Sequence, residues 1–184
     1  QSVLVVLTMA LIIPLTAGDF DLSIAANLTL SAMVLALLNA KAGWPLGLAI
    51  PVSLGVGLIT GIVNASVILY FRIPSLIVTL GTGTFINGIV LWISGSMTIS
   101  GLSPSLVQWV IVTRLFGIPL AFYYALALCC AIWYLLDYTM LGRRLLFVGR
   151  GREVARLSGI RVTRIRFGAL VASGFLSSAA GLLY

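Results

Sequence analysis

The chain has very little charge for its length. Only 8% of its 184 residues are Asp, Glu, Lys or Arg, whereas 61% are hydrophobic. A soluble domain usually carries about a quarter of its residues as charged side chains. With a mean hydropathy of +1.19, the chain is excluded from the soluble class. Because one helix needs about 20 apolar residues to cross a bilayer, several spans are expected.

The residues that build most metal and catalytic sites are also scarce. The chain has no histidine and two cysteines, which excludes any site that needs an imidazole. Cys129 and Cys130 are adjacent within an apolar run, so they lack metal-ligand spacing and cannot form an ordinary disulfide. We interpret them as packing residues. We predict no catalytic residues, no metal site and no cofactor, and we do not expect an enzyme.

Apolar runs separated by glycine, proline or charge predict a single all-α, polytopic membrane domain over residues 1–184. Both ends of the chain lie inside apolar helical patterns, so we expect a fragment of a longer protein. About six transmembrane helices are predicted in it. Their expected ranges are 1–17, 24–40, 45–70, 74–94, 117–136 and 165–184.

The positive charge is concentrated in one segment. The formal net charge is +7, and eight of the eleven basic residues are arginines within residues 137–166. The positive-inside rule places this loop in the cytoplasm. Alternation of the predicted spans then puts Arg72 on the same side and Lys41 and Arg114 on the opposite side. Some of these arginines are expected to contact anionic lipid. Nucleic-acid binding is not expected, because aromatic residues are not interleaved with the arginines.

Neutral polar side chains recur at helical spacing within three of the predicted spans. One interpretation is that they join helices, because Ser, Thr and Asn form hydrogen bonds between membrane helices and Gly57 and Gly61 permit close approach. The other is a path for an uncharged, hydroxyl-rich solute, and the two can coexist. The candidate path residues are Asp21, Ser23, Asn27, Ser31, Asn64, Thr79 and Asn87.

Ionisable residues are absent from three predicted spans, 24–40, 45–70 and 74–94. A proton or sodium relay normally uses such residues, so any uphill transport is expected to draw energy from a partner. Asp19 and Asp21 lie in the break before the second span. Each is expected in water, in a cavity or against a partner, since a bare acid in a bilayer costs about 3 kcal/mol on insertion scales.

The arginine-rich loop contains a short predicted helix over residues 152–158. Glu153 lies near its start and Arg156 near its end, and both charges interact favourably with the helix dipole. Val154 and Leu157 lie three residues apart on one face, and Ala155 would let another surface come close. The sequence therefore predicts a small, exposed, half-apolar projection on the cytoplasmic side.

Three ordered motifs resemble one transporter family. Residues 18–24, Gly-Asp-Phe-Asp-Leu-Ser-Ile, resemble the Gly-Gly-Ile-Asp-Leu-Ser-Val motif of permeases from monosaccharide ABC importers of the ribose, xylose and arabinose type. Residues 71–82 are similar to the segment before that family's next helix, and residues 141–144 with 156–160 are similar to its cytoplasmic loop. These permeases belong to the branched-chain amino acid and ribose permease superfamily.

The resemblance implies a multi-pass permease of the bacterial inner membrane, acting in transport. Its implied partners are a second permease subunit, identical or different, a cytoplasmic ABC ATPase that binds the ATP, and an extracytoplasmic solute-binding protein. The short helix then becomes the coupling helix that enters a groove of the ATPase. The implied coupling residues are Arg152, Glu153, Val154, Ala155, Arg156, Leu157, Ser158 and Gly159.

The resemblance also ranks the two acids and leaves the solute open. Asp21 matches the family motif, whereas Asp19 replaces a common glycine, so the motif predicts the larger role for Asp21. A monosaccharide or similar polyol is the expected solute. Branched-chain amino acids or nucleosides, carried by the same mechanism, remain alternatives. An ion-coupled secondary transporter is a further alternative, because Asp137 precedes Gly-Arg-Arg at residues 142–144, although at the wrong spacing.

Overall fold

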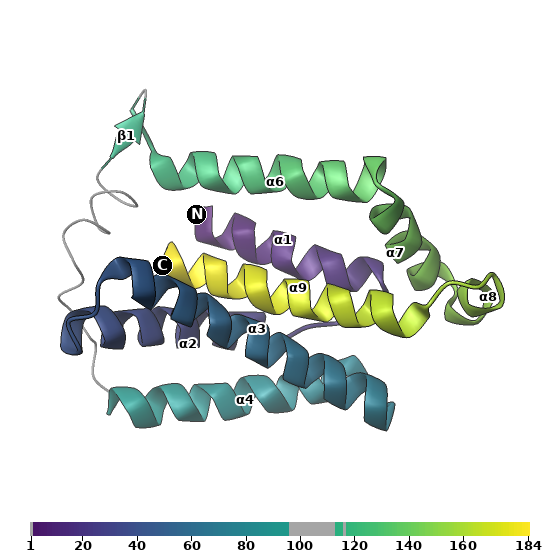
Figure 1. The fold of residues 1–184 in the computed structure, drawn as a ribbon, viewed down its shortest axis with the longest axis horizontal. Coiled ribbons are helices and arrows are strands. Elements are labelled where there is room, and N and C mark those ends of the chain that lie inside the picture. Colours follow the sequence, from purple (N-terminus) through teal and green to yellow (C-terminus); the bar gives the residue numbers. More distant parts are fainter. Residues whose placement is uncertain (1, 96–112, 116) are drawn as a thin grey trace.

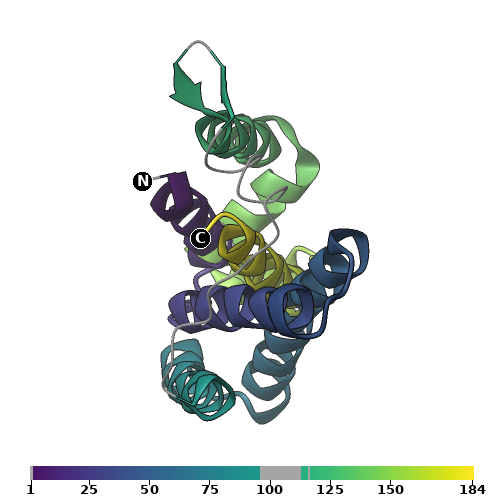
Figure 2. The same cartoon turned by 90° about the vertical axis from the view of Figure 1, so that its left-hand side faces the viewer.

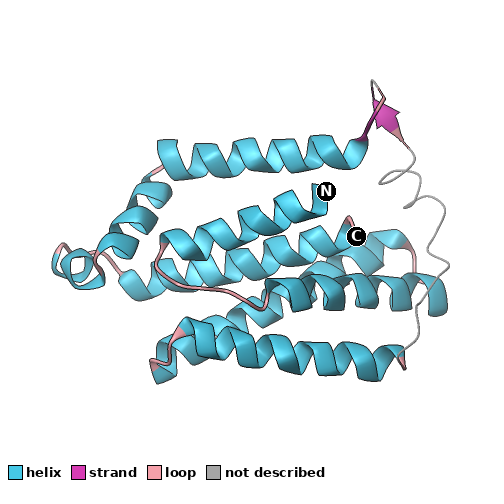
Figure 3. Cartoon of the chain, turned by 180° about the vertical axis from the view of Figure 1, so that it is seen from behind, coloured by secondary structure: helices cyan, strands magenta, loops and turns pink. Residues whose placement is uncertain are grey.

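A computed structural model describes residues 2–95, 113–115 and 117–184. Almost all of the described chain is helical (Figure 3). The elements, labelled as in Figure 1, are α1 (Ser2–Thr16), α2 (Ile24–Ala36), its π-helical continuation η1 (Leu37–Lys41), α3 (Leu46–Phe71), α4 (Ser75–Ser94), the paired β1 (Arg114–Leu115) and β2 (Ile118–Pro119), α6 (Leu120–Tyr138), α7 (Met140–Arg150), α8 (Arg152–Leu157) and α9 (Val162–Leu182).

All six predicted apolar segments are helices, with small shifts at their ends. Five of the helical segments are long and apolar enough to cross a membrane, namely α2 with η1, α3, α4, α6 and α9. Helix α1 is also apolar but has only 15 residues. The all-α, multi-pass class predicted from hydropathy is therefore confirmed.

The arginine-rich segment has more helix than the sequence pattern predicted. Residues 137–166 were expected to be a loop with one short helix, but α7 occupies the first part of this segment. The Thr139 hydroxyl caps α7 by accepting a hydrogen bond from the Gly142 amide at 3.3 Å. Leu145 and Val148 are buried three residues apart, whereas the three arginines of α7 are exposed. The loop prediction was wrong here because these apolar residues recur at helical spacing.

Helix α9 is the centre of the bundle. It packs against α1, α2 and α3, while α4 lies outside α2 and α3, and α6 packs against α1 (Figures 1 and 2). Arg72, at the end of α3, lies at the same end of the bundle as α7 and α8, whereas η1 and β1 lie at the other end. This arrangement is the one that alternating spans and the positive-inside rule predict.

Helices α3 and α9 approach closely because small residues face each other. A Cβ atom added at Gly57 would overlap the Gly174 carbonyl oxygen and the Ser178 side chain. A Cβ at Gly174 would in turn overlap the Gly57 carbonyl oxygen. In a membrane the hydrophobic effect does not drive helices together, because lipid is as apolar as the side chains. Close van der Waals contacts between small residues stabilise the association instead.

We predict that Gly57→Ala lowers the free energy of unfolding of the full-length protein by about 1–3 kcal/mol, because the added methyl group overpacks the α3–α9 contact. The measurement is thermal or denaturant unfolding in detergent. Gly55→Ala is the matched control on the same helix, since a Cβ at Gly55 meets no atom within 4 Å. Equal stability of the two variants would contradict the close approach.

Candidate functional site

The candidate site begins where α1 ends. Gly18 takes a left-handed conformation with φ of 79°, which a glycine adopts without steric cost. The Asp19 amide then bonds back to the Pro14 carbonyl oxygen at 2.9 Å, closing the last turn of α1. From Asp19 to Ser23 the chain is not helical and runs back inside the bundle to the start of α2 (Figure 3).

Helix α4 supplies hydrogen-bond partners to the backbone of this break. The Phe20 amide donates to Ser75 Oγ at 3.0 Å, and the Leu22 amide donates to Thr79 Oγ1 at 3.1 Å. Thr79 Oγ1 lies 2.8 Å from the Ser75 carbonyl oxygen and 3.3 Å from that of Phe20. Irregular backbone is tolerated at membrane depth only when buried protein groups satisfy it. Thr79, a candidate path residue, thus holds the break in place.

Asp21 is buried and organises the start of α2. Its Oδ1 accepts bonds from the Ser23 amide at 3.1 Å and the Ser23 hydroxyl at 2.6 Å, and its Oδ2 accepts one from Ser173 on α9 at 2.8 Å. Asn64 on α3 donates to Ser23 Oγ at 2.9 Å. Asp21 and Ser23 therefore connect α2 with α3 and α9, through hydroxyl and amide donors.

Asn27 makes the next connection, one turn along α2. Its Nδ2 donates to the Gly174 carbonyl oxygen at 2.8 Å and to Ser177 Oγ at 2.6 Å, both on α9. Its Oδ1 accepts a bond from Thr60 of α3 at 2.9 Å. Both N–H groups of the buried Asn27 amide therefore donate and its oxygen accepts a bond. These bonds join α2, α3 and α9.

Ser31 repeats the pattern one turn further on. Its hydroxyl lies 2.7 Å from Ser53 Oγ and donates to the Ser178 carbonyl oxygen at 3.0 Å. Six of the seven candidate path residues are thus buried and bonded between or beside helices, as the helix-joining interpretation predicts. Asn87 differs, because it is exposed on α4. Asn64 Oδ1 is the buried side-chain atom that has no hydrogen-bond partner within the described residues.

Asp19 links the break to the cytoplasmic segment. Arg166 on α9 binds it with two bonds, Nε to Oδ2 at 2.6 Å and Nη2 to Oδ1 at 2.7 Å. Arg152, the first residue of α8, reaches Asp19 Oδ1 at 3.1 Å and the Gly18 carbonyl oxygen at 2.5 Å. The sequence motif ranked Asp19 below Asp21, yet Asp19 forms the ion pairs seen among the described residues.

The sequence weakly indicates that Asp19 needs a partner. It is one of four acids in a chain with eleven basic residues, and an acid beside a helix break was expected to need a partner. The identity of that partner was beyond the sequence, because Arg152 and Arg166 are separated from Asp19 by 133 and 147 residues.

Helix α8 exposes part of the surface that the resemblance assigned to it. Leu157 is 82% exposed and Val154 is 59% exposed, and Glu153, Arg156, Ser158 and Gly159 are also exposed. Ala155 is fully buried, so the interpretation that its small side chain admits an external surface was wrong. It faces inward because the six-residue helix must bury one side to stay attached to α7 and α9.

The described residues offer no group of three or more His, Cys, Asp or Glu side chains that could hold a metal ion. Asp137 is exposed near the end of α6. The buried acids instead bind arginine, serine and backbone groups.

The comparison with protein families covers the whole chain. Residues 1–184 match the family described as branched-chain amino acid transport system / permease component. The chain belongs to this family. It is a family of transport permeases. With five apolar helices of spanning length among the described residues, the protein is a multi-pass inner-membrane protein.

The curated relatives include the autoinducer 2 import system permease protein LsrD. The chain is 32% identical to that of Photorhabdus laumondii over 184 residues, 30% identical to that of Salmonella typhi and 28% identical to that of Yersinia pseudotuberculosis. Each alignment covers 97% of this chain and 55% of the relative. The chain thus spans about half the length of these relatives. No solved structure matches it.

A double-mutant cycle tests the Asp19 site. The side chains of Asp19 and Arg166 are 2% and 15% exposed, whereas that of Arg152 is 46% exposed. Removing one partner of a buried pair costs about 3–5 kcal/mol, but an exposed pair contributes only about 0–1 kcal/mol.

We therefore predict a larger coupling energy for Asp19→Ala with Arg166→Ala than for Asp19→Ala with Arg152→Ala. The free energy of unfolding of the full-length protein in detergent is the quantity to measure. Arg164→Ala, on the same helix, is the control for loss of charge alone. A coupling no larger with Arg166 than with Arg164 would contradict the observed geometry.

Proposed function

We propose that this chain is part of the permease subunit of an ATP-driven ABC importer, working with a second permease subunit, a cytoplasmic ATPase and an extracytoplasmic solute-binding protein. The observation that carries the proposal is helix α8. It is a short, half-apolar helix on a cytoplasmic segment, and it is bonded directly to a break in the membrane helices. Membership of the permease family supports the same assignment.

The proposed coupling surface consists of Glu153, Val154, Arg156, Leu157, Ser158 and Gly159. Its apolar centre is Leu157 with Val154, the two exposed apolar side chains of α8. Exposed apolar residues flanked by charged ones are typical of a protein interface. Ala155 and Arg152 belong to the inner side of α8, where they hold the helix to the rest of the permease.

Helix α8 is bonded to residues of the membrane domain through which its movement could be transmitted. Arg152 connects α8 to Gly18 and Asp19, and Asp19 connects to Arg166 on α9. Residues 20 and 22 of the same break bind α4. Movement of α8 by an ATPase would therefore act on α4 and α9 through one continuous set of hydrogen bonds and ion pairs.

Two of the candidate path residues have polar groups that no described hydrogen bond uses, one exposed and one buried. Asn87 is exposed on α4, and the buried Asn64 keeps an acceptor that no described group uses. A hydroxyl-rich solute, or the water it brings, supplies donors for both. The remaining candidates, among them Asn27 and Thr79, would shape the path by fixing the positions of α2, α4 and α9.

A small neutral solute fits the polar groups best. The uncharged stripes favour a monosaccharide or similar polyol, and the names of the relatives make autoinducer 2 the first solute to test. The family description favours branched-chain amino acids as the second candidate class. The absence of acids and bases from α2, α3 and α4 argues against ion coupling, since relays use such residues.

We predict that Leu157→Asp in the full-length protein lowers ATP-dependent uptake at least about tenfold, because a hot-spot side chain at an interface contributes about 2 kcal/mol or more. Membrane insertion and thermal stability should stay unchanged, since Leu157 is 82% exposed. The assay is uptake into proteoliposomes of the complete transporter, with labelled autoinducer 2, ribose or leucine as the solute.

Leu157→Met is the matched control, and it should retain most of the uptake. Ala155→Glu is a second comparison, and it should reduce stability as well as uptake because Ala155 is buried. Uptake by Leu157→Asp at the rate of the unchanged protein would refute the coupling surface. Uptake that follows a sodium or proton gradient without ATP would refute the importer class.

A further inference from the structure

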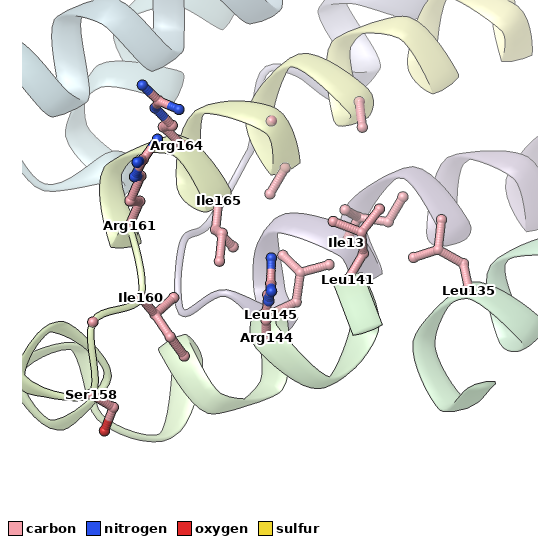
Figure 4. Close-up of a pocket in the computed structure, with 14 residues that line it drawn as sticks. Ile13, Leu135, Leu141, Arg144, Leu145, Ser158, Ile160, Arg161, Arg164 and Ile165 are labelled. Atoms are coloured by element: carbon pink, nitrogen blue, oxygen red, sulfur yellow. The ribbon is translucent and has the colours of Figure 1, made fainter. Parts of the chain in front are cut away.

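A cavity lies on the opposite side of α9 from α4. Its volume is about 760 Å³, and residues of α1, α6, α7 and α9 line it together with the turn after α8. Figure 4 shows Ile165 of α9, Leu145 of α7 and Ile13 of α1 around the space between these helices. Neither the ion pairs of Asp19 nor the candidate path residues belong to this cavity.

The inner walls of the cavity are apolar. They include Ile13 of α1, Leu135 of α6, Leu145 of α7 and Ile165 of α9. Leu135 and Ala172 belong to helices long enough to span the membrane, so this part of the cavity lies at membrane depth. Gly168 forms part of the wall, and a Cβ atom there would meet nothing within 4 Å. An apolar chain would find both space and matching walls.

The cytoplasmic side of the cavity is basic. Arg144, Arg161 and Arg164 line it, and no acid does. In the part of the chain that the structure describes, none of these three arginines forms an ion pair. In Figure 4, Arg144 lies beside the apolar side chains between α7 and α9, whereas the side chains of Arg161 and Arg164 point away from them. All three arginines are exposed, and their positive charge favours an anionic ligand.

We propose that this cavity binds an anionic phospholipid of the cytoplasmic leaflet. An acyl chain lies against the apolar walls, and the phosphate of the headgroup pairs with Arg144. Charge complementarity selects this occupant, because a free phosphate would leave the apolar walls unused and a neutral lipid would leave the arginines unpaired. Basic pockets between membrane helices on the cytoplasmic side are suited to anionic headgroups.

Arg144 is the residue that tests the headgroup contact most cleanly. Arg161 and Arg164 also line a polar cavity beside Asp19, whereas Arg144 does not. Arg143 is the matched control, since it is exposed on the same helix and lines neither cavity. Gly168→Phe fills the apolar part, with Gly88→Phe on α4 as its control because a Cβ at Gly88 also meets open space.

The experiment uses the full-length permease, reconstituted in equimolar phosphatidylglycerol and phosphatidylcholine and then washed in mild detergent. The phospholipid that it retains is measured by mass spectrometry. We expect phosphatidylglycerol to be enriched, and we expect Arg144→Gln to lower its retention about fivefold, as the loss of one arginine near an anionic headgroup predicts. Gly168→Phe should lower it as well, and the two control variants should retain it.

Three results would overturn the proposal. Equal retention of both lipids by the unchanged protein would show that no anionic site exists, and a failure of Gly168→Phe to fold would then indicate that a segment of the protein fills the cavity. An equal loss in Arg143→Gln and Arg144→Gln would indicate a diffuse surface effect. Displacement of the lipid by inorganic phosphate alone would assign the arginines to a simple anion site. None of these readouts depends on transport.

Discussion

The Phe20 and Leu22 amides lie in a non-helical break between α1 and α2, so their positions depend on neighbouring side chains. Ser75 and Thr79 of α4 supply bonds to the Phe20 and Leu22 amides, and Ser23 and Ser173 surround the Asp21 carboxylate. An unsatisfied polar group in hydrocarbon costs several kcal/mol. This requirement fixes where α4 and α9 can lie relative to α2, and the rest of the bundle follows from it.

One acid and two arginines hold the same break. Asp19 is almost completely buried and binds Arg166 and Arg152, so a single acid joins the end of α1, the start of α9 and the start of α8. In a low-dielectric setting a buried acid is retained only with such partners. The break is therefore both a structural joint inside the membrane and the place where the cytoplasmic helix is attached. We infer that this attachment is what transmits movement of α8.

Much of the fold could be predicted from the sequence, because membrane helices depend on local hydropathy. The six apolar segments, their alternation and the short helix at residue 152 all follow from runs of apolar residues and from glycine and charge at the breaks. Helix α7 was missed because its three arginines were interpreted as part of a charged loop, although its apolar residues recur at helical spacing. The inward position of Ala155 was missed because a six-residue helix shows too little periodicity to tell its two faces apart.

The candidate site could be predicted only in part, since its contacts join distant residues. The polar residues of α2, α3 and α4 were found by their spacing, but their partners Gly174, Ser177 and Ser178 lie on α9, 147 to 150 residues away from Asn27 and Ser31. The role of Asp19 likewise depends on Arg166, which only the folded chain brings near. Local pattern identifies such residues as polar and helical, and the tertiary structure decides what they bind.

We infer that α8 is the contact between this membrane domain and an ATPase. Site-specific cross-linking tests it directly, with Leu157→Cys introduced into the full-length permease after Cys129→Ala and Cys130→Ala have removed the chain's own thiols. We expect a short thiol-reactive cross-linker in native membranes to join residue 157 to the ATPase subunit. Leu58→Cys in the middle of α3 should give no such product. If neither position cross-links in membranes where ATP-driven uptake is intact, α8 is not the contact with the ATPase.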